Sequence, residues 1–143
     1  MFRFRLQQVL DLREQHERAL ASQLAQAMGA EREAQAALEG LRAVRTASGE
    51  AVMGGSHSIG ELTNLAFILD RLDGQIANAS DAVTAAGQTV AQMKDAVTAA
   101  FQDRRVLDRL RERQAESHRA AEGQIDQRTM DDIALTRYTQ QDS

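Results

Sequence analysis

Few residues of this 143-residue sequence have the types and the spacing that catalysis or metal binding needs. Ser56 and His57 are adjacent and could act as nucleophile and base. They follow Gly54 and Gly55, however, and polar side chains in a Gly-rich turn usually satisfy turn hydrogen bonds instead. The three histidines are His16, His57 and His118. Because they are far apart and the sequence has no cysteine, we expect no metal site.

Nucleotide hydrolysis and carboxylate chemistry are not expected either. The sequence contains no G-x-x-x-x-G-K-[ST] motif, and Lys94 is its only lysine. Asp131 and Asp132 are neighbours, but successive residues of a helix diverge by about 100° and do not share a site. We therefore predict a protein that is not an enzyme, with no catalytic residue and no cofactor.

An arginine-rich stretch over residues 103–119 raises the question of nucleic-acid binding. Single basic helices do bind DNA. Here six arginines are interleaved with four acidic residues, and no aromatic residue is available for base stacking. No apolar run is long enough for a transmembrane helix, and polar residues follow Arg3 and Arg5, unlike a signal peptide. We expect no nucleic-acid partner, no membrane insertion and a cytoplasmic location.

The elements that carry these residues are expected to be long helices. The sequence has no proline, cysteine or tryptophan and only five aromatic residues, and it is rich in good helix formers. The patterns predict a helix over residues 2–47, a Gly-rich loop over 48–58 and a helix over 59–138. Gly49 stands where a glycine cap is common, and Ser58 with Glu61 forms a capping box. All of residues 1–143 are expected to form one elongated domain.

Apolar periodicity predicts how the two helices pack. In the second helix, apolar residues recur at alternating steps of three and four, which is typical of a coiled coil. These residues are Leu62, Leu65, Leu69, Leu72, Ile76, Ala79, Val83, Ala86, Val90, Met93, Val97 and Ala100. The first helix has a less regular stripe at Leu6, Val9, Leu10, Leu20, Leu24, Leu38, Leu41 and Val44, with Arg13, Glu17 and Glu31 on or beside it. The predicted fold is all-α, an antiparallel two-helix coiled coil with unequal arms.

The unequal lengths predict a single-helix overhang. A hairpin that turns near residue 54 places Phe2 opposite about residue 107, so the second helix extends beyond the first by about 45 Å at ~1.5 Å per residue. Phe2, Phe4 and Leu6 are then expected beside Phe101, Leu107 and Leu110, where large side chains hold the open end together. Arg104 occupies a position of the apolar seam.

Both ends of the chain resemble the flagellar export protein FliJ family. The opening matches Phe-x-Phe-x-Leu-x-x-Val-Leu-x-Leu-Arg, from Phe2 to Arg13. The later match comprises Leu107, Leu110, Arg111 and Arg113, followed by Asp131, Asp132, Ile133, Ala134 and Arg137. The resemblance implies a non-enzymatic coiled-coil stalk at the cytoplasmic side of the flagellar type III export apparatus, peripherally associated with the membrane. It binds the hexameric export ATPase, the cytoplasmic part of the export gate and export chaperones.

The resemblance also suggests which residues make these contacts. For the ATPase, we expect Phe2, Phe4, Leu6, Arg104, Arg105, Arg109, Arg111 and Arg113. For the export gate, the nearest positions are Leu38, Leu41, Arg45, Ile68, Leu72 and Gln75, although Leu72 belongs to the predicted seam and core packing is its simpler role. Two alternatives stay open: the equivalent stalk of a virulence secretion injectisome, and a generic scaffold that dimerises weakly through its charged overhang.

Overall fold

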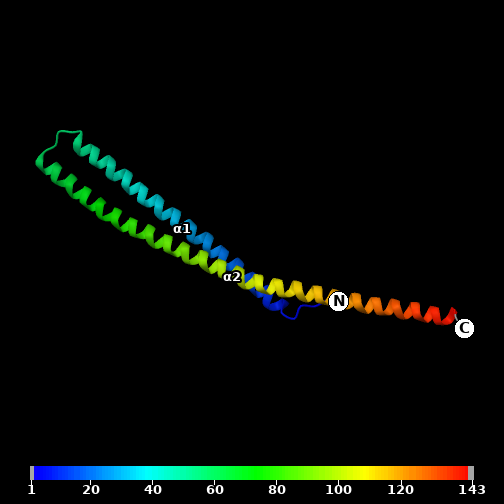
Figure 1. Ribbon diagram of the computed structural model, residues 1–143. Helices are drawn as coiled ribbons and strands as arrows, with labels where there is room; N and C mark the ends of the chain where they lie inside the picture. Colours follow the sequence, from blue (N-terminus) through cyan, green and yellow to red (C-terminus); the bar gives the residue numbers. More distant parts are fainter. Residues whose placement is uncertain (1, 142–143) are drawn as a thin grey trace. The chain divides into compact units, whose positions relative to one another are not determined.

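Two long helices make up the described part of the chain. The computed structural model describes residues 2–141, in which α1 spans Gln7–Met53 and α2 spans Ile59–Gln141 (Figure 1). The two helices pack against each other, and the described residues contain no strand. The predicted all-α, two-helix coiled-coil hairpin is therefore confirmed.

By its internal contacts the chain divides into two compact units, where the sequence pattern predicts a single domain. Residues 18–98 form the central unit. The residues on either side of it, 2–17 and 99–141 in the described range, form the terminal unit.

The helix ends differ from the predicted bounds in three places. Residues 2–6 are not helical, and α1 begins at Gln7, whose N–H donates to the Phe4 carbonyl at 3.1 Å. At its other end α1 continues to Met53, because Gly49 adopts an ordinary helical conformation rather than a cap; no glycine in residues 2–141 has a positive φ. The loop is thus confined to residues 54–58, and α2 extends to Gln141.

The start of α2 agrees with the prediction in its details. The helix begins at Ile59, directly after Ser58. The Glu61 N–H donates to Ser58 Oγ at 3.2 Å, and the Ser58 N–H donates to Glu61 Oε2 at 3.4 Å. This reciprocal pair is the capping box, which satisfies backbone donors that have no partner within the helix.

In the central unit, the two helices pack along the predicted seam. The seam residues of α2 from Leu65 to Val97 are buried or half-buried, with Val90 only 6% exposed. Leu62 is 42% exposed. Arg45 Nε donates to Asp73 Oδ1 at 2.8 Å, and Gly87 lies beside the Glu31 carboxylate. These facing pairs centre the hairpin near residue 59 rather than 54, so Leu62 lies beyond the level at which α1 ends.

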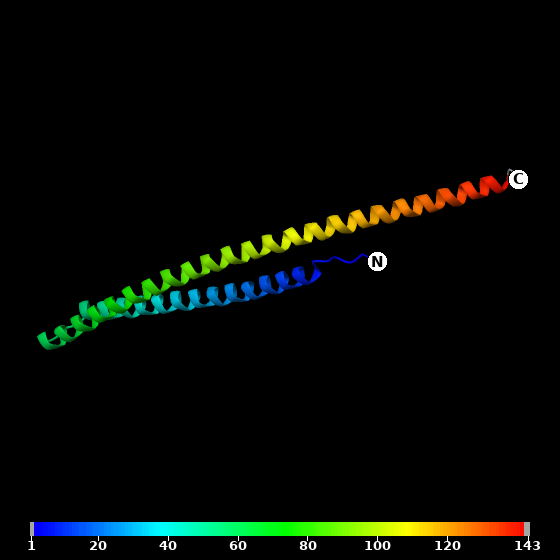
Figure 2. The ribbon, with the colours of Figure 1, turned by 90° about the horizontal axis from the view of Figure 1, so that it is seen from below.

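In the terminal unit, too, the first residues of the chain lie opposite later residues of α2 than the sequence predicts. Gln7 lies opposite Arg111, and the Phe2 ring lies 5.6 Å from the His118 ring, not beside Leu107. Phe101 is 46% exposed and is not part of the contact with Phe2. From residue 119 to residue 141 every position of α2 is exposed, and the helix continues alone past the N-terminal segment (Figure 2). This overhang, residues 119–141, is about 35 Å long at ~1.5 Å per residue.

Candidate partner-binding site

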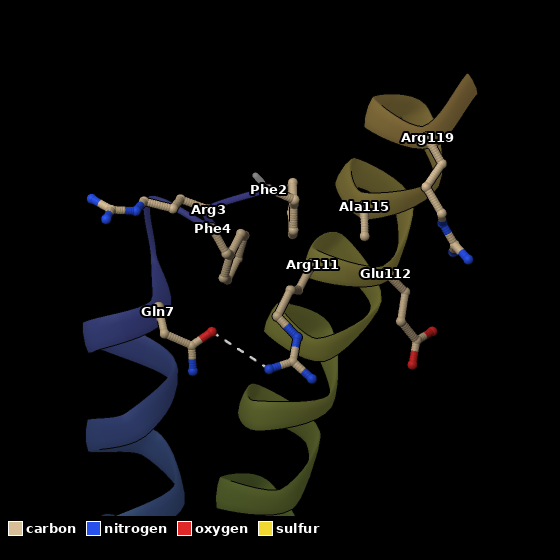
Figure 3. A pocket seen from close by; sticks show the side chains of 8 residues that line it. All are labelled: Phe2, Arg3, Phe4, Gln7, Arg111, Glu112, Ala115 and Arg119. Atoms are coloured by element: carbon tan, nitrogen blue, oxygen red, sulfur yellow. Dashed lines mark hydrogen bonds between the residues drawn. The ribbon is translucent and has the colours of Figure 1, made fainter. Parts of the chain in front are cut away.

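The non-helical N-terminal segment packs its aromatic side chains onto α2. Phe4 is only 8% exposed, and Phe2 is half-buried with its ring tilted by 54° to that of His118. In Figure 3 both rings point toward α2, whereas the guanidinium groups of Arg3 and Arg119 point away from Phe4. These aromatic contacts hold the first residues in place, because removing apolar surface from water stabilises the packed arrangement. Leu6, the third residue expected in this contact, is 38% exposed.

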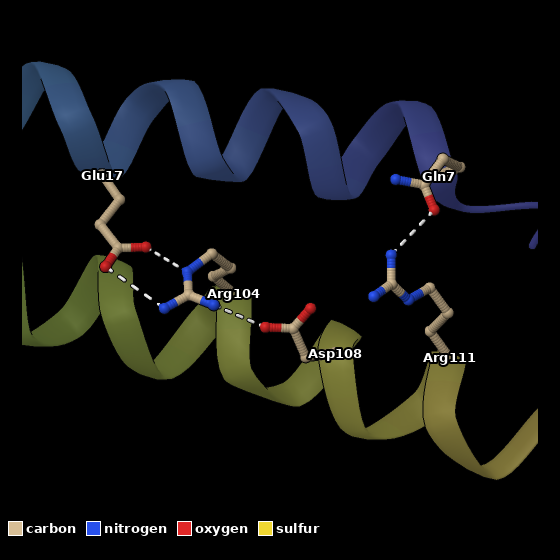
Figure 4. Close-up of polar contacts among 5 residues, drawn as sticks. All are labelled: Gln7, Glu17, Arg104, Asp108 and Arg111. Atoms are coloured by element: carbon tan, nitrogen blue, oxygen red, sulfur yellow. Dashed lines mark hydrogen bonds and ion pairs between the residues drawn. The ribbon is translucent and has the colours of Figure 1, made fainter.

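Arg104 sits between the helices in a cluster of charged side chains (Figure 4). Its Nε donates to Glu17 Oε2 and its Nη2 to Glu17 Oε1, the latter at 3.5 Å. Its Nη1 donates to Asp108 Oδ2 at 2.5 Å. The three side chains are only 15–22% exposed. An arginine can therefore occupy a seam position, because two carboxylates accept hydrogen bonds from its guanidinium group.

The charge state of Arg104 follows from these contacts. The hydrogen bond to Glu17 raises the pKa of Arg104 above its ordinary value, and the charges of Glu17 and Asp108 act in the same direction. A raised pKa keeps the guanidinium protonated at every pH near neutrality. Arg104 is thus a fixed charge engaged inside the hairpin, and partner binding has to use other arginines while this contact is intact.

Four of the five expected arginines are exposed on the terminal unit, Arg111 among them. Arg105, Arg109 and Arg113 are exposed, and the first two line a shallow groove with Phe101 and Val106. Phe101 is 46% and Val106 65% exposed, and the Arg104 guanidinium lies 5.2 Å from the Phe101 ring centroid. Exposed apolar surface beside basic side chains is a common composition of protein-binding sites.

Arg111 has a partner within the hairpin. Its Nη1 donates to Gln7 Oε1 at 3.4 Å (Figures 3 and 4). All five expected arginines precede residue 114, so they lie beside residues 2–17 and not on the overhang. The overhang therefore begins later than the sequence predicts and does not include these five arginines, because α1 reaches further along α2 than a turn near residue 54 would allow.

The overhang has its own composition. It carries four acidic residues (Glu122, Asp126, Asp131 and Asp132) and three arginines (Arg119, Arg128 and Arg137). Its large apolar residues are 45–67% exposed: Ile125, Met130, Ile133, Leu135 and Tyr138. A single helix cannot bury these side chains by itself, so this segment presents apolar surface together with charges of both signs to any partner.

Of the residues expected at the export gate, three contribute to the packing of the central unit instead. Leu38 is 7% exposed, and Leu41 and Leu72 are half-buried. These side chains are covered while the hairpin is folded, as the seam position of Leu72 predicts. Arg45 forms an ion pair with Asp73, whereas Ile68 and Gln75 are exposed. Of the six residues expected at the gate, Ile68 and Gln75 are the two whose side chains are exposed on the central unit.

The contact between Glu17 and Arg104 is the feature that sequence reasoning missed. Both residues interrupt otherwise apolar stripes, one on each helix, and their charges are opposite. Two such interruptions could have been paired with each other, because a buried charge requires a partner. That pairing would have predicted the register, since it brings residue 17 opposite residue 104.

Two of the histidines make local contacts. His57 Nε2–H donates to the Ala51 carbonyl at 3.1 Å, so this ring satisfies a hydrogen bond of the turn. His118 lies 3.7 Å from the Glu122 carboxylate and packs on Phe2. Within residues 2–141 no three histidine or acidic side chains gather in a way that could hold a metal. No helix in that range combines the length and apolar character needed to cross a membrane.

The sequence matches the model of a known protein family. The family model described as "Flagellar FliJ protein" matches residues 1–143, the whole sequence. No curated protein and no solved structure matches this sequence.

Proposed function

The chain belongs to the flagellar FliJ protein family, a family of non-catalytic components of the flagellar export apparatus, and from this premise we propose that it is a stalk and coupling factor for the export ATPase. The proposal includes contacts with the hexameric ATPase, with the cytoplasmic part of the export gate and with export chaperones. It also includes a cytoplasmic location at the flagellar base, peripheral to the membrane.

The observation that carries the proposal is the form of the terminal unit. A single helix of 23 residues, 119–141, continues beyond a two-helix section whose exposed arginines lie next to it. Such a helix can enter a ring of subunits that a thicker hairpin cannot enter. Exposed Arg105, Arg109 and Arg113 then meet the rim of the ring, where contacts between charged groups exchange readily because solvent screens them.

For the export gate, the exposed positions Ile68 and Gln75 are the part of the expected set that supports a contact. The covered residues Leu38, Leu41 and Leu72 stabilise the hairpin that presents them. A coupling factor needs two separate contact surfaces. The exposed side chains of the terminal unit would form one, and those of the central unit would form the other.

The proposal is tested by measuring ATP turnover of a purified flagellar export ATPase with and without this protein. We expect the natural chain to raise turnover, and the combined variant Arg105→Glu, Arg109→Glu, Arg113→Glu to lose most of that increase. Removal of residues 119–143 is expected to have the same effect. The matched control is Arg71→Glu, which reverses an exposed charge in the central unit.

Two results would contradict this proposal. If the natural chain neither binds the ATPase nor changes its turnover, the stalk function is wrong. If the triple variant stimulates as well as the natural chain, these arginines are not part of the contact. Helix content measured by circular dichroism ensures that each variant is folded.

A further inference from the structure

One face of α2 in the terminal unit carries two exposed groups of side chains. Phe101, Arg105 and Arg109 follow one another at steps of four, and so do Met130, Ala134 and Tyr138. Residues four apart share a face of a helix. The middle residues, Arg105 and Ala134, are 29 positions apart, which is about eight turns at ~3.6 residues per turn. Both groups therefore lie on the same face, and each lines a shallow groove.

We propose that this face is a dimer interface on which a second copy of the chain packs, with α2 antiparallel to α2. The two groups lie at equal distances on either side of residue 120, so a two-fold axis near Ala120 brings each group onto the other. Phe101 then faces Tyr138 of the second copy, and Arg105 faces Ala134. Because the interface is two-fold, every such contact occurs twice.

One pair of opposite charges favours this arrangement, whereas Arg105 comes within one helical turn of Arg137 of the second copy, which carries a like charge. Arg109 faces Met130 of the second copy and lies next to its Asp131, which is an opposite charge within reach of a long side chain. Near the axis, Glu116 of one copy lies close to Arg119 of the other. A parallel arrangement would instead place arginines against arginines and aspartates against aspartates, which is unfavourable.

The space near the axis and the exposed apolar area also suit a second helix. Ala120 and Gly123 are small, and a side chain built at Gly123 would meet nothing within 4 Å. Phe101 is 46%, Met130 67% and Tyr138 65% exposed in the single chain. Pairing covers all three twice over. Since these patches are smaller than a standard interface, the dimer is weak, with a dissociation constant on the order of 10–100 μM.

The dimer has a consequence that rests on the proposed function. It covers the overhang and Arg109, which the ATPase contact uses, so dimerisation and ATPase binding exclude each other. A chain that is present above this dissociation constant is then held largely as a dimer whose apolar overhang is covered. Self-association itself is independent of this consequence and is measured without any ATPase.

The test is sedimentation equilibrium of the full chain and of two single charge reversals, Arg109→Asp and Asp131→Arg. Each reversal replaces both attractive pairs with two repulsive ones, so we expect dimerisation of each variant alone to weaken at least about tenfold. A mixture of the two variants restores every opposite-charge pair, because residue 109 of one copy then matches residue 131 of the other in both contacts. The mixture is therefore expected to dimerise as the natural chain does.

The matched control is Arg128→Asp, which reverses an exposed charge of the overhang about 140° around the helix from Arg105 at ~100° per residue. It should leave dimerisation unchanged. A natural chain that stays monomeric at concentrations well above ~100 μM would overturn the proposal. Single variants that dimerise normally, or a mixture no heavier than its components, would overturn this interface. The ATPase test of the natural chain is independent of these results, because it is made at concentrations where the chain is monomeric.

Discussion

Leu10 is the strongest test of how the terminal unit is held together. Its side chain is 0% exposed, and it is the largest side chain that is fully buried among the described residues. Leu10→Ala truncates this fully buried side chain and leaves a cavity, which costs about 2–5 kcal/mol in protein cores. A hairpin of two helices can close part of that cavity, so we expect the lower part of the range, about 2–3 kcal/mol.

The matched control is Leu12→Ala, two residues away on the same helix, because Leu12 is 64% exposed. Both substitutions remove the same atoms, and alanine is as good a helix former as leucine. We expect Leu12→Ala to change the stability by less than about 0.5 kcal/mol. The contrast between the two variants therefore isolates burial from composition and helix propensity.

The assay is hydrogen exchange of backbone amides, followed segment by segment. A loss of 2–3 kcal/mol corresponds to roughly 30- to 150-fold faster exchange, at about tenfold per 1.4 kcal/mol. We expect this acceleration in residues 7–17 and 99–118, with residues 24–45 and 65–97 nearly unchanged, because the terminal unit has its own contacts. Equal effects of Leu10→Ala and Leu12→Ala would refute the assigned core. Acceleration spread evenly through both helices would refute separate opening of the terminal unit.

Two further predictions concern the start of α2 and the register of the helices. Ser58→Ala removes the capping box and is expected to lower the stability of the central unit by about 1 kcal/mol, measured by thermal unfolding. Replacing Glu17 and Arg104 together by leucine should change the melting temperature little, since an apolar pair often replaces a partly buried ion pair without loss and the Asp108 side chain, 15% exposed, still reaches solvent. It should, however, reduce disulfide formation between cysteines placed at Gln7 and Arg111, because the helices can then slide.

Each of these two predictions has a control within the same chain. Ser56→Ala alters an exposed loop serine and should have little effect, so an equal loss at Ser56 and Ser58 would contradict the capping role. The natural chain has no cysteine, so the placed pair is the only one that can form. An unchanged disulfide yield in the double leucine variant would show that Glu17 and Arg104 do not select the register.

Much of the fold follows from local properties of the sequence. The absence of proline and the alternating steps of three and four in residues 65–100 are enough for two long helices with facing stripes. The Ser58–Glu61 pair sets the start of α2, because only nearby atoms take part in it. The family match over residues 1–143 depends on residue order alone. For the same reason, the arginine-rich stretch over residues 103–119 could be identified before its neighbours were known.

The register, by contrast, was decided by tertiary contacts. Apolar burial is non-directional, and sliding one helix by seven residues leaves every apolar stripe facing another. An Ala-rich seam distinguishes such alternatives poorly. Specific pairs decide among them: Arg45 with Asp73 in the central unit and Glu17 with Arg104 in the terminal unit. These pairs moved the start of the overhang from about residue 107 to residue 119, and with it the answer to which arginines stand beside α1.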